Sequence, residues 1–259
     1  MSALAPPLPG AVSDTLVLTG RSLRHWIRQP QLMLLSTVQP VMLVLLFTQV
    51  FGGAVDTPGI RYVDYLLPGV LVQTVAWDST QTAVGIAADL GTRTVERFRS
   101  LPMSPVAALA GRTLADLCRT VFVCALMTGT AALIGFRVHG GAPAALAAFA
   151  LVCAFGYAMS WLFALIGLMV RGAEAALAAS FVWVFPLMFA SNALVPTGSM
   201  PGWLRGFAEH QPISQVVGAA RALLLGEPAG RWLLPALAWT AGALLLAVPL
   251  AVRRYYRAT

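Results

Sequence analysis

A short charged stretch, residues 92–103, lies between two long apolar segments. Arg97 and Arg99 carry guanidinium forks, which bind carboxylates on a partner protein, and Phe98 between them could enter an apolar pocket. Pro102 disfavours helix at the residue before it, so a short helix should end there. This stretch could dock on another protein. The alternative is that its arginines reflect only the positive charge found on the inner side of membrane proteins.

A second group of polar residues interrupts the apolar segment 65–88. Asp78 lies in its middle, and a carboxylate at the centre of a membrane helix costs about 2.5–3.5 kcal/mol to insert. Such a residue should face protein or water. With its polar neighbours it forms a stripe at helical spacing: Gln73, Thr74, Asp78, Gln81 and Thr82. We predict that this stripe lines a translocation path or a subunit interface; hydrogen bonding between helices of one chain is the alternative.

The sequence lacks the residue patterns of a metal site and of an ATP-binding phosphate loop. The three histidines lie far apart and outside the apolar segments, and the three cysteines show no metal-ligand spacing. All 17 residues counted as lysine or arginine are arginine, so the chain cannot form a Walker A phosphate loop, which needs lysine. We expect no catalytic residue, no metal and no cofactor in this chain, and no nucleic acid partner.

The elements that position these residues are membrane helices. Hydrophobic residues make up 58% of the 259 residues and charged residues 10%, whereas a soluble domain carries about 25% charged residues. Several apolar segments reach the ~20 residues that cross a bilayer. We predict a single all-α polytopic membrane domain over 1–259, with six spans at about 32–51, 65–88, 114–135, 144–170, 175–195 and 232–252.

The arginines set the orientation of these spans. If the N-terminus is cytoplasmic, only five of the 17 fall in outer segments: Arg61, Arg137, Arg205, Arg221 and Arg231. The positive-inside rule therefore places both termini and residues 92–103 on the cytoplasmic side of the plasma membrane.

Two further segments should lie at the membrane surface. Residues 13–31 place Leu23, Trp26 and Ile27 on one face of a basic helix, which is typical of an interfacial amphipathic helix. Residues 196–231 are too polar to span and should form one or two short helices that dip into the outer interface. A solvated tail and a surface loop are the respective alternatives.

Three motifs carry a resemblance to a known family: "LPGVLVQTVAW", "VERFRSLPMSPVAALAGRTLADL" and "NALVPTGSMPGWLRGFAEHQPISQVVGAARALLLG". They resemble the permease subunits of type-2 ABC exporters, and most closely the daunorubicin-resistance permeases of actinomycetes. The motifs cover about 65–231. The resemblance implies a cytoplasmic amphipathic helix before the first span, a coupling helix over 92–103 and re-entrant helices over 196–231.

The resemblance also implies the partners. ATP and magnesium would bind a separate ATPase subunit, present in two copies, and a second permease subunit, either identical or a paralogue, would complete the path. By matching position, the residues that contact the ATPase are Glu96, Arg97, Phe98, Arg99, Ser100, Leu101 and Pro102. We expect an actinobacterial exporter, contacting membrane lipid, for a hydrophobic drug, a lipid or a glycolipid.

Two other functions remain open at this point. A secondary transporter would be expected to show paired repeats and several ionisable residues within the membrane, but only Asp78 qualifies and no repeat is visible. A membrane-embedded enzyme would be expected to gather its polar residues near one interface, and the histidines are scattered.

Overall fold

The computed structural model describes residues 8–28, 30–51, 61–91, 105–194, 197 and 200–258. The described part of the chain is helical and contains no strand, so the predicted all-α class is confirmed. Its helices are α1 (Leu8–Arg28), α2 (Pro30–Phe51), α3 (Tyr62–Gly91), α5 (Pro105–Leu133), α6 (Gly141–Met169), α7 (Ala173–Phe189), α8 (Gly202–His210), α9 (Pro212–Leu225) and α10 (Gly230–Ala258).

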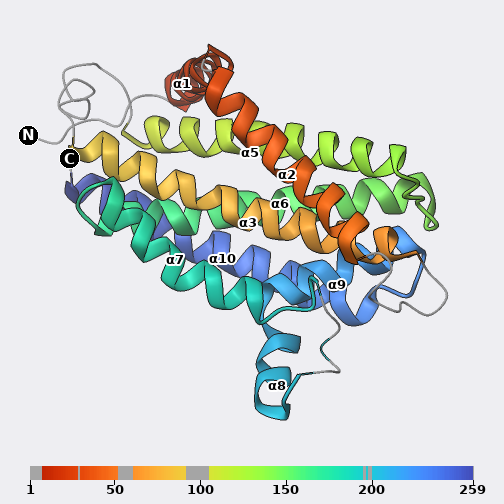
Figure 1. Ribbon diagram of the computed structural model, residues 1–259. Coiled ribbons are helices and arrows are strands. Elements are labelled where there is room, and N and C mark those ends of the chain that lie inside the picture. Colours follow the sequence, from red (N-terminus) through yellow and green to blue (C-terminus); the bar gives the residue numbers. More distant parts are fainter. Residues whose placement is uncertain are drawn as a thin grey trace, which may run out of the picture.

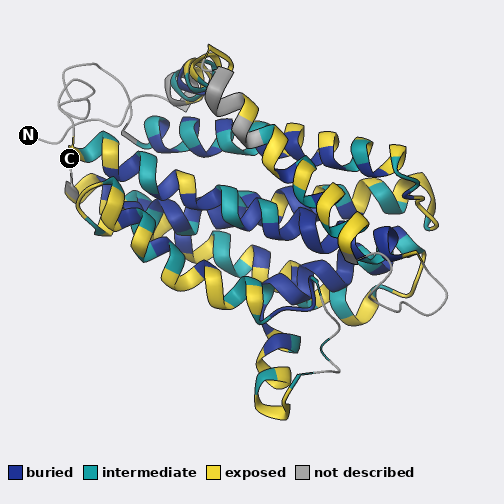
Figure 2. Ribbon diagram, viewed as in Figure 1, coloured by how far each residue is buried: buried dark blue, intermediate teal, exposed yellow. Residues whose placement is uncertain are grey.

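Helix α3 forms the centre of the bundle. It packs against α6, α7, α5 and α9, and Leu66, Val70 and Val72 on it are fully buried. Buried residues concentrate on α3, α6 and α9, whereas α2, α7 and α8 present many exposed residues (Figure 2). The exposed residues of α2 and α7 are largely apolar, as expected for helices that face lipid.

Within the described residues, three helices are long and apolar enough to cross a membrane: Val106–Leu133, Gly141–Met169 and Gly230–Arg257. Shorter apolar helices cover Thr37–Val50, Ala173–Phe189 and Pro212–Leu225. The chain is therefore a helical membrane protein, and the count of six spans stays a prediction.

Helices α1, α8 and α9 take different places relative to the long helices. Figure 1 shows α1 nearly end-on, so α1 runs across the direction of the long helices. Helix α9 is buried in the bundle between α3, α6 and α10, whereas α8 projects from it (Figure 1). On α8, Arg205 donates to Glu209 at 2.8 Å, and this hydrogen bond lowers the pKa of the Glu209 carboxyl.

Helix α7 ends at Phe189, earlier than the predicted span 175–195. The carbonyls of Asn192 and Ala193, which lie beyond its end, accept hydrogen bonds from Arg221 on α9. Because α9 supplies donors for these carbonyls, the chain can leave the helix here without unpaired backbone groups.

Helices α3 and α6 approach closely at Gly167. A Cβ at this position would lie 2.5 Å from the backbone oxygen of Ala83 and 2.9 Å from its Cα. Because both atoms belong to the backbone, no side-chain rotation can relieve the clash.

Gly167→Ala should therefore destabilise the permease by about 1–3 kcal/mol, the usual effect of overpacking. Gly129→Ala on α5 is the matched control, since nothing lies within 4 Å of its added Cβ. Alanine is the better helix former by about 1 kcal/mol, so the control should melt at the same or a higher temperature. Thermal unfolding in detergent distinguishes the two, and an unchanged melting temperature for Gly167→Ala would refute the close approach.

Candidate functional site

The predicted coupling residues Glu96–Pro102 lie outside the residues that the structure describes. The helices on either side are placed: α3 ends at Gly91 and α5 begins at Pro105. Both of these helix ends lie at the end of the bundle where α10 also finishes (Figure 1). The contacts near these ends therefore join the helices that would receive force if an ATPase docked at residues 92–103.

The first contact joins α3 and α5 near the ends that flank residues 92–104. Arg112 donates to Asp89 at 2.7 Å, with side chains that are 30% and 51% exposed. Gly85 makes room for this arginine, because a Cβ at Gly85 would lie 1.5 Å from its Nη2. A partly exposed ion pair of this kind contributes roughly 0–1 kcal/mol, so its main effect is to fix the register of the two helices.

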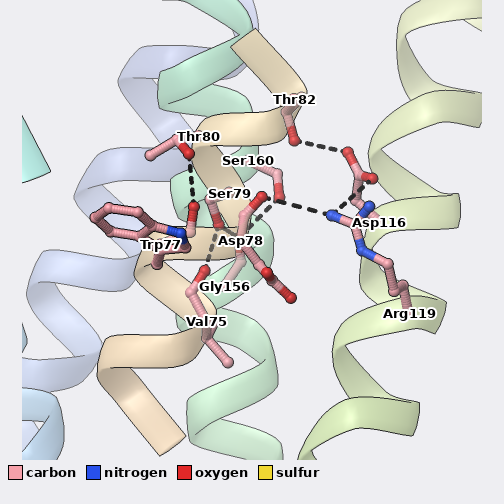
Figure 3. Close-up of polar contacts among 10 residues, drawn as sticks. All are labelled: Val75, Trp77, Asp78, Ser79, Thr80, Thr82, Asp116, Arg119, Gly156 and Ser160. Atoms are coloured by element: carbon pink, nitrogen blue, oxygen red, sulfur yellow. Dashed lines mark hydrogen bonds and ion pairs between the residues drawn. The ribbon is translucent and has the colours of Figure 1, made fainter. Parts of the chain in front are cut away.

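The second contact lies deeper along the same helices (Figure 3). Thr82 on α3 donates to Asp116 on α5 at 2.6 Å, and Arg119 forms an ion pair with Asp116 at 3.4 Å. Arg119 also reaches the backbone oxygen of Asp78 at 3.5 Å. From their spacing, Arg112, Asp116 and Arg119 could pair along one face of α5. Asp116 and Arg119 do pair, but Arg112 instead pairs with Asp89 across the helix interface.

Helix α1 packs tightly on α5. The Thr19 hydroxyl lies 3.2 Å from the Gly111 carbonyl and donates to it. A Cβ at Gly111 would meet Cβ of Leu18 at 2.8 Å, so only glycine allows this approach. Helices α1, α3 and α5 are thus joined at the end of the bundle that carries residues 92–104, and we expect them to move together.

The predicted stripe of α3 does not line one surface. Gln73 donates to the Met188 carbonyl of α7 at 3.2 Å, whereas Thr82 is buried and bonded to Asp116. Asp78 and Gln81 line a cavity beside α1 and α5, and Thr74 is partly buried. The structure therefore gives two stripe residues partners within this chain, and the role of the stripe as a translocation path stays a prediction.

Arg221 is a residue whose role the sequence reasoning missed. Its guanidinium donates to the backbone oxygen of Tyr65 at 3.0 Å and to that of Asn192 at 3.1 Å. It also lies 3.7 Å from the centre of the Tyr65 ring. It therefore joins α9, the start of α3 and the turn after α7. The signal was a lone arginine within the apolar helix "PISQVVGAARALLL", since such a charge needs partners inside the protein.

Among the described residues, no group of three or more histidine, cysteine or acidic side chains could hold a metal ion. The described part of the site thus consists of helix-to-helix polar contacts and the cavity that Asp78 lines. Such an arrangement can hold helices together and bind a ligand.

Comparisons with known proteins agree with this architecture. The ABC-2 type transporter family model matches residues 13–225. The chain is 33% identical to the daunorubicin resistance ABC transporter permease protein DrrB1 of Streptomyces coeruleorubidus, over 96% of this chain and 88% of that protein. It is 28% identical to the probable doxorubicin resistance ABC transporter permease protein DrrC of Mycobacterium tuberculosis, over 96% of this chain and 94% of that protein. The chain belongs to the ABC-2 type transporter family, as a permease subunit of the daunorubicin-resistance type.

Proposed function

We propose that this chain forms the membrane path of an exporter in the plasma membrane, driven from the cytoplasm by two copies of a separate ATPase. The observation that supports this most is the family match over residues 13–225, joined to relatives that are named as transporter permeases. The chain is not itself an ATPase, because permease subunits of this kind leave hydrolysis to a partner. ATP and magnesium would bind that partner.

The geometry supports a mechanical role for residues 92–104. These residues connect α3 to α5, and the pair of Arg112 with Asp89 holds the two helices at their adjoining ends. Closure of the ATPase dimer would push on this connection and tilt the joined helices α1, α3 and α5. Two copies of the permease, or one copy and a paralogue, would then alternate between inward and outward access. In this arrangement both termini and residues 92–104 are cytoplasmic, and six helices span the membrane.

The cargo we propose is amphiphilic. Two of the relatives are named for resistance to daunorubicin and doxorubicin, and the spans present a largely apolar surface that would suit a hydrophobic drug, a lipid or a glycolipid.

Transport into inside-out vesicles tests the energy source. The permease and its ATPase would be expressed together, and uptake of a fluorescent hydrophobic amine would be followed with ATP or with an imposed proton gradient. We expect uptake with ATP and none with the gradient alone, and no uptake when the ATPase Walker A lysine is replaced. Uptake driven by the gradient without nucleotide would instead identify a secondary transporter.

A further inference from the structure

A cavity of about 1220 Å³ lies between α1, α3 and α5. Its walls combine apolar side chains, among them Leu16, Trp26 and Trp77, with charged ones from all three helices. This volume is somewhat above the about 300–1,000 Å³ that ligand pockets commonly enclose, so it has room for a drug-sized molecule, and its mixture of apolar and charged walls favours an amphiphile.

The charged side chains that line the cavity lie at different distances from the end of α3. Asp89 lies two residues before the end of α3, whereas Asp78 lies eleven residues earlier, about 16 Å further along the helix at 1.5 Å per residue. The three arginines of α1 that line the cavity are exposed: Arg21, Arg24 and Arg28. The cavity thus has a cationic, exposed side at α1 and runs inward to Asp78.

On the walls that α3 and α5 form, carboxylates outnumber arginines by one. The carboxylates are Asp78, Asp89 and Asp116, and the arginines are Arg112 and Arg119. Arg119 forms its ion pair with Asp116; its charge also attracts the Asp78 carboxylate, but its hydrogen bond there goes to the backbone oxygen of Asp78. Within the described part of the chain, no hydrogen bond or ion pair reaches the Asp78 carboxylate, and Figure 3 draws none. Arg112, the other cation from α5, is paired with Asp89 nearer the helix end.

We propose that this cavity binds the protonated amine of an amphiphile, with Asp78 as its counter-ion. A carboxylate held away from bulk water gains most from a cation that donates a hydrogen bond to it. Trp77, which also lines the cavity, offers an aromatic face that attracts cations. The apolar part of the ligand would lie against the leucine and tryptophan side chains. This inference rests on the proposed function, because it describes where the cargo is first held.

The test uses the full permease with its ATPase in nanodiscs of zwitterionic lipid. The probe is a dodecane chain with a dansyl group at one end and a free amine at the other, and its partner is the same molecule with the amine acetylated. Binding is followed by dansyl fluorescence. We expect the amine to bind at least about tenfold more tightly than the acetylated form, the effect of one close charge pair.

Asp78→Asn should remove this preference, and Asp78→Glu should keep part of it. Glu174→Gln is the control, since Glu174 is an exposed carboxylate on α7 outside the cavity lining; it should keep the preference. Melting temperatures and retention of the ATPase show that each variant is folded and assembled.

Equal binding of both probes to the wild type, or an unchanged preference in a folded Asp78→Asn, would overturn the proposal. Tighter binding of a matched dodecyl carboxylate than of the amine would also overturn it. ATP-driven uptake by inside-out vesicles that contain the same permease and ATPase would leave the proposed function standing in each of these cases, so the two failures can be told apart.

Discussion

Reversing the charges of Arg97 and Arg99 together should release the ATPase from the permease. Removing charge pairs from an interface costs at least ~2 kcal/mol, so copurified ATPase should fall by about thirtyfold or more. The variant R97E/R99E should still insert in the membrane, because the apolar segments on either side are unchanged. The measurement is the ratio of ATPase to permease after affinity purification, together with ATP-driven uptake in vesicles, which should be lost.

The control is R253E/R254E near the end of α10. These two arginines are exposed and lie at the same end of the bundle as the connection between α3 and α5 (Figure 1), so the control makes the same change in net charge there. It should retain the ATPase. Equal release by both variants would show that the ATPase responds to general surface charge, and full retention by R97E/R99E would remove the docking role.

Replacing Arg221 with leucine should loosen the opposite end of the bundle. Three backbone oxygens accept hydrogen bonds from this side chain: those of Tyr65, Asn192 and Ala193. A carbonyl left unpaired away from water costs about 1–3 kcal/mol, so the Arg221→Leu variant should melt well below the wild type in detergent. Arg221→Lys should lie between the two, because an ammonium is a point donor without the planar fork of the guanidinium.

Arg205→Leu is the matched control for this second prediction. Arg205 lies in the same predicted outer segment but is 53% exposed and pairs with Glu209 on its own helix, and such surface pairs contribute roughly 0–1 kcal/mol. Its melting temperature should stay close to that of the wild type, while the pKa of Glu209 returns toward its usual value because the lowering hydrogen bond is gone. A larger loss of stability for Arg205→Leu than for Arg221→Leu would contradict the assigned role.

The all-α membrane class could be predicted from the sequence because apolar length alone determines it. Helices over 13–31 and 196–231 were also predicted; α1 overlaps the first segment, and α8 and α9 lie in the second. Pro212 and Gly226 mark the ends of α9, as local backbone preferences favour. Helix α1 nevertheless begins at Leu8, earlier than expected, because the segment before Asp14 has no strong start signal.

Contacts between helices could not be predicted in the same way. The pairing of Arg112 with Asp89 depends on the space that Gly85 leaves across the interface, and sequence spacing shows only neighbours on one helix. The split of the α3 stripe has the same cause: Gln73 faces α7, whereas Asp78 and Gln81 face the cavity beside α1. Polar residues that recur at helical spacing identify one face of a helix, but they do not identify the neighbouring helix that packs on that face.

The account depends on the cytoplasmic position of residues 92–103 and on their burial against the ATPase. A cysteine introduced by Phe98→Cys, in a chain whose exposed Cys118 is replaced by serine, can report both through a membrane-impermeant maleimide. The account predicts labelling in inside-out vesicles that contain the permease alone, strong protection once the ATPase is assembled, and no labelling of intact cells. Labelling of intact cells, or equal labelling with and without the ATPase, would contradict it.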